Sequence, residues 1–259
     1  MTPGAALAAD GENALNGADT AYVAIAALLV LIMTPALGFF YGGLVRRKNT
    51  INTIMMPMIC LAIFTVQWFL YGYSLSFGPD VGGIIGNLDW AFFKNVGMAA
   101  EPEYSETIPH ILFALFQMAF AILTPAIISG GIAERMRFPA YCLFVLLWGT
   151  LVYDPMAHMV WGGGFLASLP AGLVTLDFAG GTVVHICAGT TGLALACYLG
   201  KRNSRTMKRA HSIPMVFFGC FLLWFGWFGF NGGSGLVANG QAISAMTVSM
   251  IAAVCAMAA

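Results

Sequence analysis

The sequence is poor in charged residues, which make up 8% of its 259 positions. Soluble domains carry about 25% of Asp, Glu, Lys and Arg. Lys and Arg total 11, as do Asp and Glu, so the formal net charge is zero and no basic surface is available to follow a phosphate backbone. Hydrophobic residues account for 59% of the chain. This composition excludes nucleic-acid binding as a main function and indicates an integral membrane protein.

The chain also lacks the residue clusters on which enzymes and metal sites depend. Its 6 cysteines and 4 histidines show no close Cys/His pairing, so we expect no metal site, no redox motif and no cofactor. The cysteines all lie in apolar stretches, where we expect them to be buried small side chains. Gly-rich phosphate loops, nucleophile elbows and paired-carboxylate sites are missing too. We therefore expect a protein that is not an enzyme.

Long runs without Asp, Glu, Lys or Arg are abundant. About 20 apolar residues suffice for a helix to cross a bilayer, and five runs exceed that length. The last of them, 210–259, accommodates two spans because glycines and asparagines near 231–240 mark a turn within it. A sixth run, 138–153, is short, at about 24 Å of helix. We predict an all-α, polytopic membrane helix bundle with seven span cores near 21–44, 51–77, 108–133, 138–154, 178–199, 212–231 and 238–259.

Basic residues gather in the loops after the first, third and fifth predicted spans. Those loops hold 10 of the 11 Lys and Arg residues. The opposite side holds Lys94 and most of the acids, namely Asp80, Asp89, Glu101, Glu103, Glu106 and Asp154. Because Lys and Arg in short loops mark the cytoplasmic side, the sequence predicts an N-terminus outside the cell.

The predicted topology divides the chain into two parts. Residues 1–19 form a polar, acidic extracytoplasmic lead, and residues 20–259 form the membrane domain. The last run ends in Ala-Met-Ala-Ala without a closing basic loop. We therefore expect the chain to be an N-terminal portion of a membrane domain that is incomplete at its C-terminal side.

His185 is the residue least expected in a membrane span, since an ionisable side chain in lipid is costly. A glycine one turn before and another one turn after would let a second backbone or a pore approach the imidazole. His185 is either a buried histidine bonded to a carbonyl or a pore residue that accepts or relays a proton. Asp177, at the start of the same span, either caps the helix or helps to hold a cation. His158 falls in the segment 157–164, which we expect to be irregular.

Aromatic residues form a second group of candidate site residues. Phe116 and Phe120 are four apart and share a helix face. Trp161 precedes three glycines, and Phe230 precedes Asn-Gly-Gly-Ser234. Because the chain has 20 Phe residues, core or lipid-facing packing is the default for each. The faces of Trp and Phe can nonetheless hold a cation, and the Ser234 hydroxyl can accept a hydrogen bond from an ammonium-type donor.

Six motifs stand out in chain order: GFFYGGLVRRKN (38–49), YGYSLSFG (71–78), AERMRF (133–138), AHMVWGGG (157–164), LDFAGGTVVH (176–185) and GWFGFNGGS (226–234). Together they resemble the ammonium transporter (Amt) branch of the Amt/Rhesus superfamily. The resemblance extends from the first span to the chain end and omits only the lead and the 79–107 loop. It implies a homotrimeric cell-membrane protein whose subunits normally have eleven spans around a narrow hydrophobic pore.

The resemblance also implies roles for the aromatic residues. Trp161, Phe120 and Ser234 correspond to an outer site that recruits ammonium, and Phe116 corresponds to the wall of the neighbouring vestibule. Phe120 and Phe230 correspond to a stacked gate beneath that site. Trp161 also favours the ammonium transporter branch over the Rhesus branch, whose outer site is less similar.

In the same comparison Asp177 matches an acid near the outer site, and His185 matches the first of two pore histidines, the second lying in a later span. A bare ion of ammonium size enters hydrocarbon at a cost on the order of 20 kcal/mol. We therefore expect transport of ammonium or ammonia in which the proton parts from the nitrogen. The lipid bilayer and a cytoplasmic PII-type regulator are the further partners that the resemblance implies. The alternative is a membrane ammonium sensor, in which this module is fused to a C-terminal signalling domain.

Overall fold

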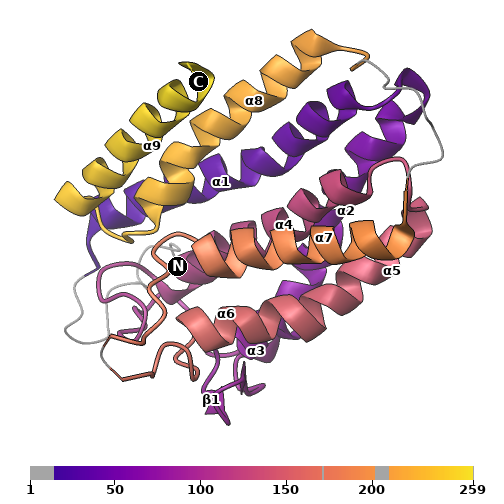
Figure 1. The fold of residues 1–259 in the computed structure, drawn as a ribbon. Coiled ribbons are helices and arrows are strands. Elements are labelled where there is room, and N and C mark those ends of the chain that lie inside the picture. The colour runs from indigo at the N-terminus through magenta and orange to yellow at the C-terminus, as the bar shows by residue number, and fades with distance from the viewer. Residues whose placement is uncertain (1–14, 171, 202–209, 259) are drawn as a thin grey trace, which may run out of the picture.

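A computed structural model describes residues 15–170, 172–201 and 210–258 (Figure 1). These residues are mostly helical. The α-helices, in chain order, are α1 (Gly17–Leu44), α2 (Thr50–Gln67), α3 (Tyr73–Phe77), α4 (His110–Ile132), α5 (Phe138–Trp148), α6 (Asp154–Trp161), α7 (Cys187–Leu199), α8 (Ile213–Trp227) and α9 (Gly240–Ala258).

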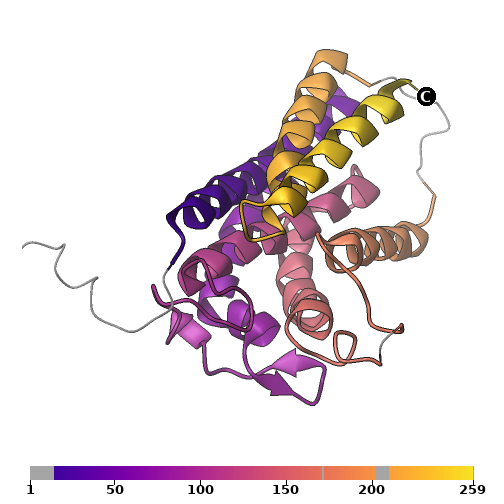
Figure 2. The ribbon, with the colours of Figure 1, turned by 90° about the vertical axis from the view of Figure 1, so that its left-hand side faces the viewer.

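Several of these helices are joined by π-helical turns into longer spans. The turns are η2 (Trp68–Gly72) between α2 and α3, η4 (Gly149–Tyr153) between α5 and α6, η5 (Gly181–Ile186) before α7 and η6 (Phe228–Gly232) after α8. The remaining short elements are the 3-10 turns η1 (Arg47–Asn49) and η3 (Ala91–Phe93) and the antiparallel strands β1 (Asp80–Val81) and β2 (Ile85–Gly86). The two strands form a small hairpin outside the helix bundle (Figure 2).

Six of the described helices, counted with their π-turns, are long and apolar enough to cross a membrane. They are Gly17–Leu44, Arg47–Phe77, His110–Ile132, Phe138–Trp161, Gly181–Leu199 and Ile213–Gly232. The seventh predicted span corresponds to α9, whose apolar part, Gly240–Ala256, is shorter. The prediction of an all-α, polytopic membrane bundle is confirmed.

The boundaries of two predicted segments differ from the structure. The fourth span continues to Trp161 rather than ending at 154, so the expectation of an irregular segment is wrong for residues up to Trp161 and holds only from Gly162. The first helix begins at Gly17 because the side chain of Asn16 accepts hydrogen bonds from Ala18 N and Asp19 N. Helix ends thus follow local hydrogen bonding rather than the edges of the uncharged runs.

The prediction that the cysteines are buried is only partly correct. Cys60 and Cys187 are buried, as expected, but Cys197, Cys220 and Cys255 are exposed in the described chain. The expectation is therefore wrong for these three, because an apolar helix in a membrane presents apolar residues outward as well as inward.

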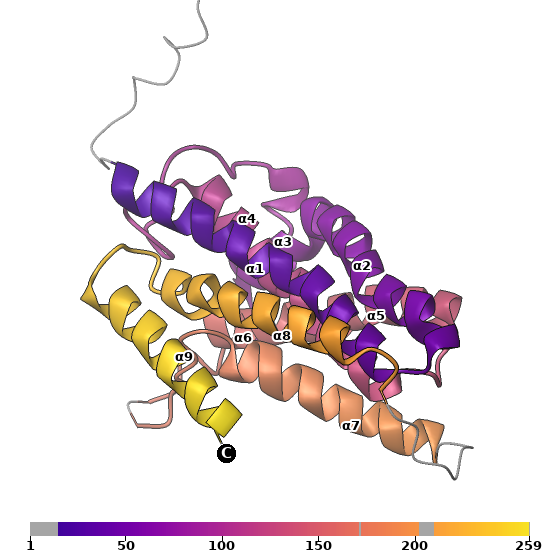
Figure 3. The same ribbon diagram turned by 90° about the horizontal axis from the view of Figure 1, so that it is seen from above.

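Helix α1 lies at the centre of the packing, against α2, α4 and α8, while α9 lies beside α8 at the edge of the bundle (Figure 3). Glycines bring α8 close to α1. A Cβ added at Gly219 would lie 2.4 Å from Phe40 N, and one at Gly226 would lie 2.2 Å from Met33 Cγ. Small residues at these positions therefore set the spacing of the two helices, as is usual in membrane bundles.

The connecting loops gather at two opposite ends of the bundle (Figure 1). At one end Arg46 Nε lies 2.8 Å from Glu134 Oε1. At the same end Arg135 Nη1 donates to the carbonyl of Gly200 over 2.9 Å. The loops after the first, third and fifth spans thus meet, and these are the loops that carry the basic residues. The basic residues at 202–209 and the lead residues 1–14 lie outside the described part of the chain.

At the other end the chain start meets two later loops. Asn16 N donates to the carbonyl of Thr107 over 2.8 Å. Asp19 Oδ1 accepts from Ala238 N over 2.8 Å, which links the first turn of α1 to the loop before α9. This end holds the 78–109 and 162–180 loops, and it is where the predicted outer site should lie.

Candidate functional site

A row of four rings crosses the bundle, with two buried rings in its middle, and each ring comes from a different element. Trp161 ends α6, Phe120 lies in α4, Phe230 lies in η6 and His185 lies in η5. Successive ring centroids are 6.0 Å apart for Trp161 and Phe120, 4.6 Å for Phe120 and Phe230, and 5.5 Å for Phe230 and His185. Phe120 and Phe230 are each only 1% exposed. The structure therefore brings four sequence-predicted site residues into one row of neighbouring rings.

Two further predicted residues contact the two middle rings of this row or their backbone. The Phe116 ring packs edge-on against Phe120 at 4.9 Å and is buried. The Ser234 hydroxyl donates to the carbonyl of Phe230 over 2.7 Å, so its oxygen retains lone pairs that can accept. The Trp161 indole N–H donates to the carbonyl of Asp177 over 2.9 Å. All six of these residues lie in one neighbourhood although they come from four separate stretches of sequence.

Asp177 caps the span that carries His185. Its Oδ1 accepts from Gly180 N at 2.6 Å and Gly181 N at 2.8 Å, and its Oδ2 accepts from Thr182 N at 2.8 Å and Val183 N at 2.9 Å. Gly180 has a φ of +99°, a left-handed conformation that favours glycine. One carboxylate thus satisfies four N–H groups at the start of a span, where no intrahelical partners exist.

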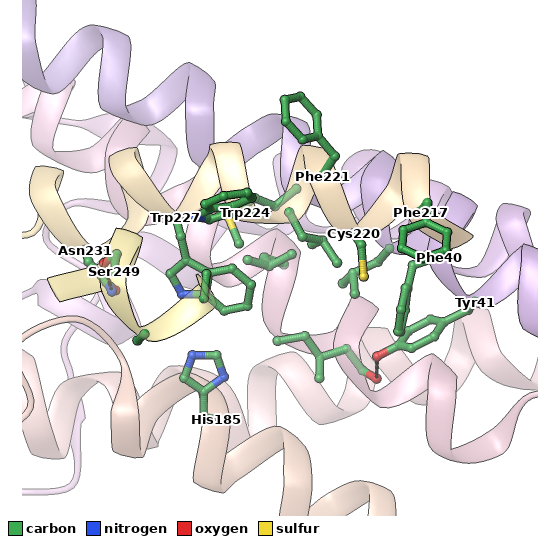
Figure 4. Close-up of a pocket in the computed structure, with 17 residues that line it drawn as sticks. Phe40, Tyr41, His185, Phe217, Cys220, Phe221, Trp224, Trp227, Asn231 and Ser249 are labelled. Atoms are coloured by element: carbon green, nitrogen blue, oxygen red, sulfur yellow. Dashed lines mark hydrogen bonds between the residues drawn. The ribbon is translucent and has the colours of Figure 1, made fainter. Parts of the chain in front are cut away.

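His185 lies in the π-turn η5 with its side chain exposed in the described chain. Its ring faces the Trp227 ring, with centroids 6.3 Å apart and planes 24° apart (Figure 4). Among the described residues no hydrogen bond of the imidazole is found.

A cavity of about 690 Å³ lies beside His185 (Figure 4). Its walls come from α1, α4, α8 and α9 and are almost wholly apolar. The polar exceptions include Asn231 and Ser249, whose side chains bond to each other, Asn231 Nδ2 donating to Ser249 Oγ over 2.7 Å. An apolar cavity that ends at an ionisable ring suits a small uncharged molecule better than a hydrated ion.

Asp154 and His158 form a buried polar cluster that sequence reasoning missed. Asp154 is expected among the loop acids, but it lies inside the fourth span and is fully buried, as is His158 one turn later. Gln67 Nε2 donates to Asp154 Oδ2 over 2.5 Å, and Ser76 Oγ lies 3.4 Å from Asp154 Oδ1. The available signal was the spacing of four between Asp154 and His158, which puts both on one helix face. Within the described residues no group of three or more His, Cys, Asp or Glu side chains could hold a metal ion.

Comparison with known proteins shows the family and the fold. The model of the Ammonium Transporter Family matches residues 21–259. An ammonium transporter of Bacillus subtilis (strain 168) is 53% identical over 228 residues, which cover 88% of this chain and 55% of the relative. The crystal structure of Candida albicans Mep2 has a TM-score of 0.81 and 35% identity, covering 92% of this chain and 52% of that one.

A solved structure named "Sensor Amt Protein" also matches, with a TM-score of 0.77 and 30% identity over 87% of this chain and 56% of that one. The chain thus spans about half the length of the relatives that it matches. The resemblance seen in the six motifs is confirmed by the family match, the identity to transporters and the fold. The chain is a multi-pass protein of the cell membrane and belongs to the ammonium transporter family.

Proposed function

We propose that the full-length protein carries ammonium or ammonia across the cell membrane along the row of rings from Trp161 to His185. The observation that carries this proposal is the continuity of the row, whose neighbouring centroids are never more than 6.0 Å apart. Its outer end is rich in groups that bind a cation, and its inner end reaches an ionisable ring beside an apolar cavity.

Recruitment takes place at the outer end of the row. The faces of Trp161 and Phe120 attract a cation through their ring quadrupoles. The Ser234 oxygen, whose proton is directed at the Phe230 carbonyl, accepts an N–H hydrogen bond from ammonium. Phe116 forms part of the wall beside them. A small cation that donates hydrogen bonds fits this set better than potassium, which donates none.

Phe120 and Phe230 act as the gate beneath the recruitment site. Their centroids lie 4.6 Å apart and both rings are buried, so a substrate that passes them must shed its water. A desolvated cation is strongly disfavoured there. At the Phe230 ring, which contacts His185, an ammonium N–H bond therefore breaks: its electron pair stays on nitrogen, its proton passes to a ring nitrogen of His185, and neutral ammonia continues inward. His185 receives or relays the proton on a ring nitrogen.

We propose that Asp177 has a structural role rather than that of a deprotonating acid. Both of its carboxylate oxygens are occupied by backbone N–H groups, two on each. Its lone pairs are thus directed at the helix start, and its side chain holds η5 in place so that His185 meets Phe230.

The sidedness and partners of the protein are proposed on two grounds. The loops that carry most basic residues meet at one end of the bundle, which we assign to the cytoplasm. The lead 1–19 and the Trp161 end then lie outside, with the membrane domain from residue 20 onward. By family resemblance we propose a homotrimer and a cytoplasmic PII-type regulator.

Transport is favoured over sensing. The curated relatives with 53% and 45% identity are both named ammonium transporters, whereas the matching structure named as a sensor is 30% identical. We therefore place the protein with the transporters.

The test is ammonium-driven current in vesicles that contain the full-length protein. We expect a saturable current, and Trp161→Ala should raise the half-saturating ammonium concentration more than it lowers the maximal current, because recruitment precedes the gate. Phe92→Ala, an exposed aromatic outside the row, serves as the control. A current no larger than that of empty vesicles would contradict transport, and an unchanged concentration dependence would remove Trp161 from the site.

A further inference from the structure

His158 holds together the outer end of the fourth span, one turn before Trp161. Its ring is fully buried, with Nδ1 3.2 Å from the Ser76 carbonyl oxygen and Nε2 2.9 Å from Asp80 Oδ1. Gly83 N also donates to the Asp80 carboxylate, at 2.8 Å and 3.1 Å, so Asp80 is surrounded by donors. The hydrogen bond from His158 lowers the pKa of Asp80. Each ring nitrogen of His158 thus lies within hydrogen-bond distance of an oxygen, Nδ1 of a backbone carbonyl and Nε2 of a carboxylate.

The backbone of His158 fixes the chain on the other side of Trp161. Its carbonyl accepts from Gly162 N and from Gly164 N, each over 3.0 Å, which ends α6 and turns the chain. The turn is closely packed, because a Cβ at Gly162 would lie 2.2 Å from the Ser76 oxygen and 2.7 Å from His158 Nδ1. Trp161 is therefore held between a side-chain anchor before it and a backbone anchor after it, both provided by one residue.

The β1–β2 hairpin completes this arrangement. Asp80 opens β1 and pairs with Gly86, while the Gly83 carbonyl at the tip of the hairpin accepts from Phe165 N over 2.8 Å. The hairpin thus contacts α6 through His158 and the following loop through Phe165. Neither Asp80 nor His158 contributes a ring to the row from Trp161 to His185.

We propose that Asp80 and His158 are positioning residues, which set the affinity for ammonium by fixing Trp161 at the outer end of the row. This inference rests on the proposed recruitment role of Trp161. The pair acts only through the placement of the indole, whose N–H must reach the Asp177 carbonyl while its ring faces Phe120. Asp80 touches no substrate, and its carboxylate is directed at His158 and Gly83.

The test uses Asp80→Ala in the full-length protein, since the Asp80 side chain is 45% exposed and its removal leaves the buried packing of His158 in place. We expect the half-saturating ammonium concentration to rise about fivefold, as for the loss of one net hydrogen bond. The maximal current should change less than about twofold. Asp89→Ala is the matched control, because Asp89 is an exposed acid of the same loop whose side chain, within the described residues, accepts a hydrogen bond from its neighbour Asn87. It should leave both quantities at their wild-type values.

The double variant Asp80→Ala with Trp161→Ala separates positioning from a general effect of charge. Positioning predicts that the double variant has the same half-saturating concentration as Trp161→Ala alone. Two results would overturn the inference. In the first, the half-saturating concentration of the double variant rises by the product of the two single-variant factors. In the second, Asp80→Ala has the wild-type half-saturating concentration although Trp161→Ala raises it. If Trp161→Ala alone leaves the half-saturating ammonium concentration unchanged, the proposed recruitment site is wrong. The single Trp161→Ala variant thus tests the recruitment site separately from the role of Asp80.

Discussion

The indole N–H of Trp161 donates to the backbone carbonyl of Asp177, while the carboxylate of the same aspartate caps the span that carries His185. One residue thus joins the Trp161 end of the aromatic row to the helix that provides its His185 end. The distance from Trp161 Nε1 to the Asp177 oxygen is 2.9 Å. A change that moves the backbone of Asp177 should therefore disturb both ends of the row together, whereas a change confined to its side chain acts on the cap.

Asp177→Asn should lower stability while leaving transport per folded protein largely intact. The amide retains one acceptor oxygen but turns an NH₂ group toward two N–H donors. The loss of a helix cap costs about 1–2 kcal/mol, which should appear as a lower thermal midpoint in detergent. A deprotonating acid would behave in the opposite way, giving a variant with wild-type stability and no ammonium-driven current. Asp89→Asn is the control for loss of an exposed carboxylate.

Glu134 should contribute stability that depends on pH. Burial alone would raise the pKa of Glu134, but hydrogen bonds from Arg46 and Asn49 prevail and lower it to about 2. Since the folded pKa lies below the ordinary value of 4.5, this contribution is present above about pH 4.5 and is lost as the pH falls through about 2. We expect Glu134→Gln to reduce stability at pH 7 by on the order of 1 kcal/mol.

The measurement is the thermal midpoint of wild-type protein and Glu134→Gln from pH 7 downward. The difference between the two should narrow as the pH falls below about 4.5. Glu106→Gln, at an exposed acid of the opposite end, serves as the control. If the difference between the two thermal midpoints stays constant down to the lowest pH, the charge of the Glu134 carboxylate does not contribute to stability.

The proposed sidedness predicts which exposed positions react from outside the cell. Single cysteines at Arg47 and Arg137, in a background without native cysteines, should resist an impermeant thiol reagent in intact cells, because both positions lie in the basic loops. A cysteine at Glu106 should react. Labelling in the reverse pattern would overturn the orientation.

The sequence predicted the helical membrane fold well because long uncharged runs have few other stable states in lipid. It misplaced the end of the fourth span because Asp154 ends an uncharged run. In the structure that carboxyl is instead paired with Gln67, 87 residues earlier. A pairing at such separation leaves no periodic signal in one sequence. The π-turn at 181–186 was missed for a similar reason, since Asp177 determines its start through four hydrogen bonds.

The candidate site could be named from the sequence only through its motifs. Hydrophobic periodicity pairs Phe116 with Phe120, but nothing in the spacing brings Trp161 or Phe230 to them, since each comes from another helix. His158 was assigned to an irregular segment because the motif 157–164 in which it lies ends in three glycines, which are typical of a loop. Its two partners, Ser76 and Asp80, lie about 80 residues earlier and could be identified only in the structure.

The central claim, that the row of rings leads to a histidine that takes up the substrate's proton, is tested most directly by currents of His185→Ala in vesicles. The variant should assemble normally, because the His185 side chain is exposed and makes no hydrogen bond within the described residues. Ile186→Ala, the exposed neighbour on the same turn, is the matched control and should behave as wild type. We predict that His185→Ala loses the ammonium-driven current or begins to conduct potassium. A well-assembled His185→Ala protein with wild-type ammonium current and wild-type selectivity against potassium would contradict the account.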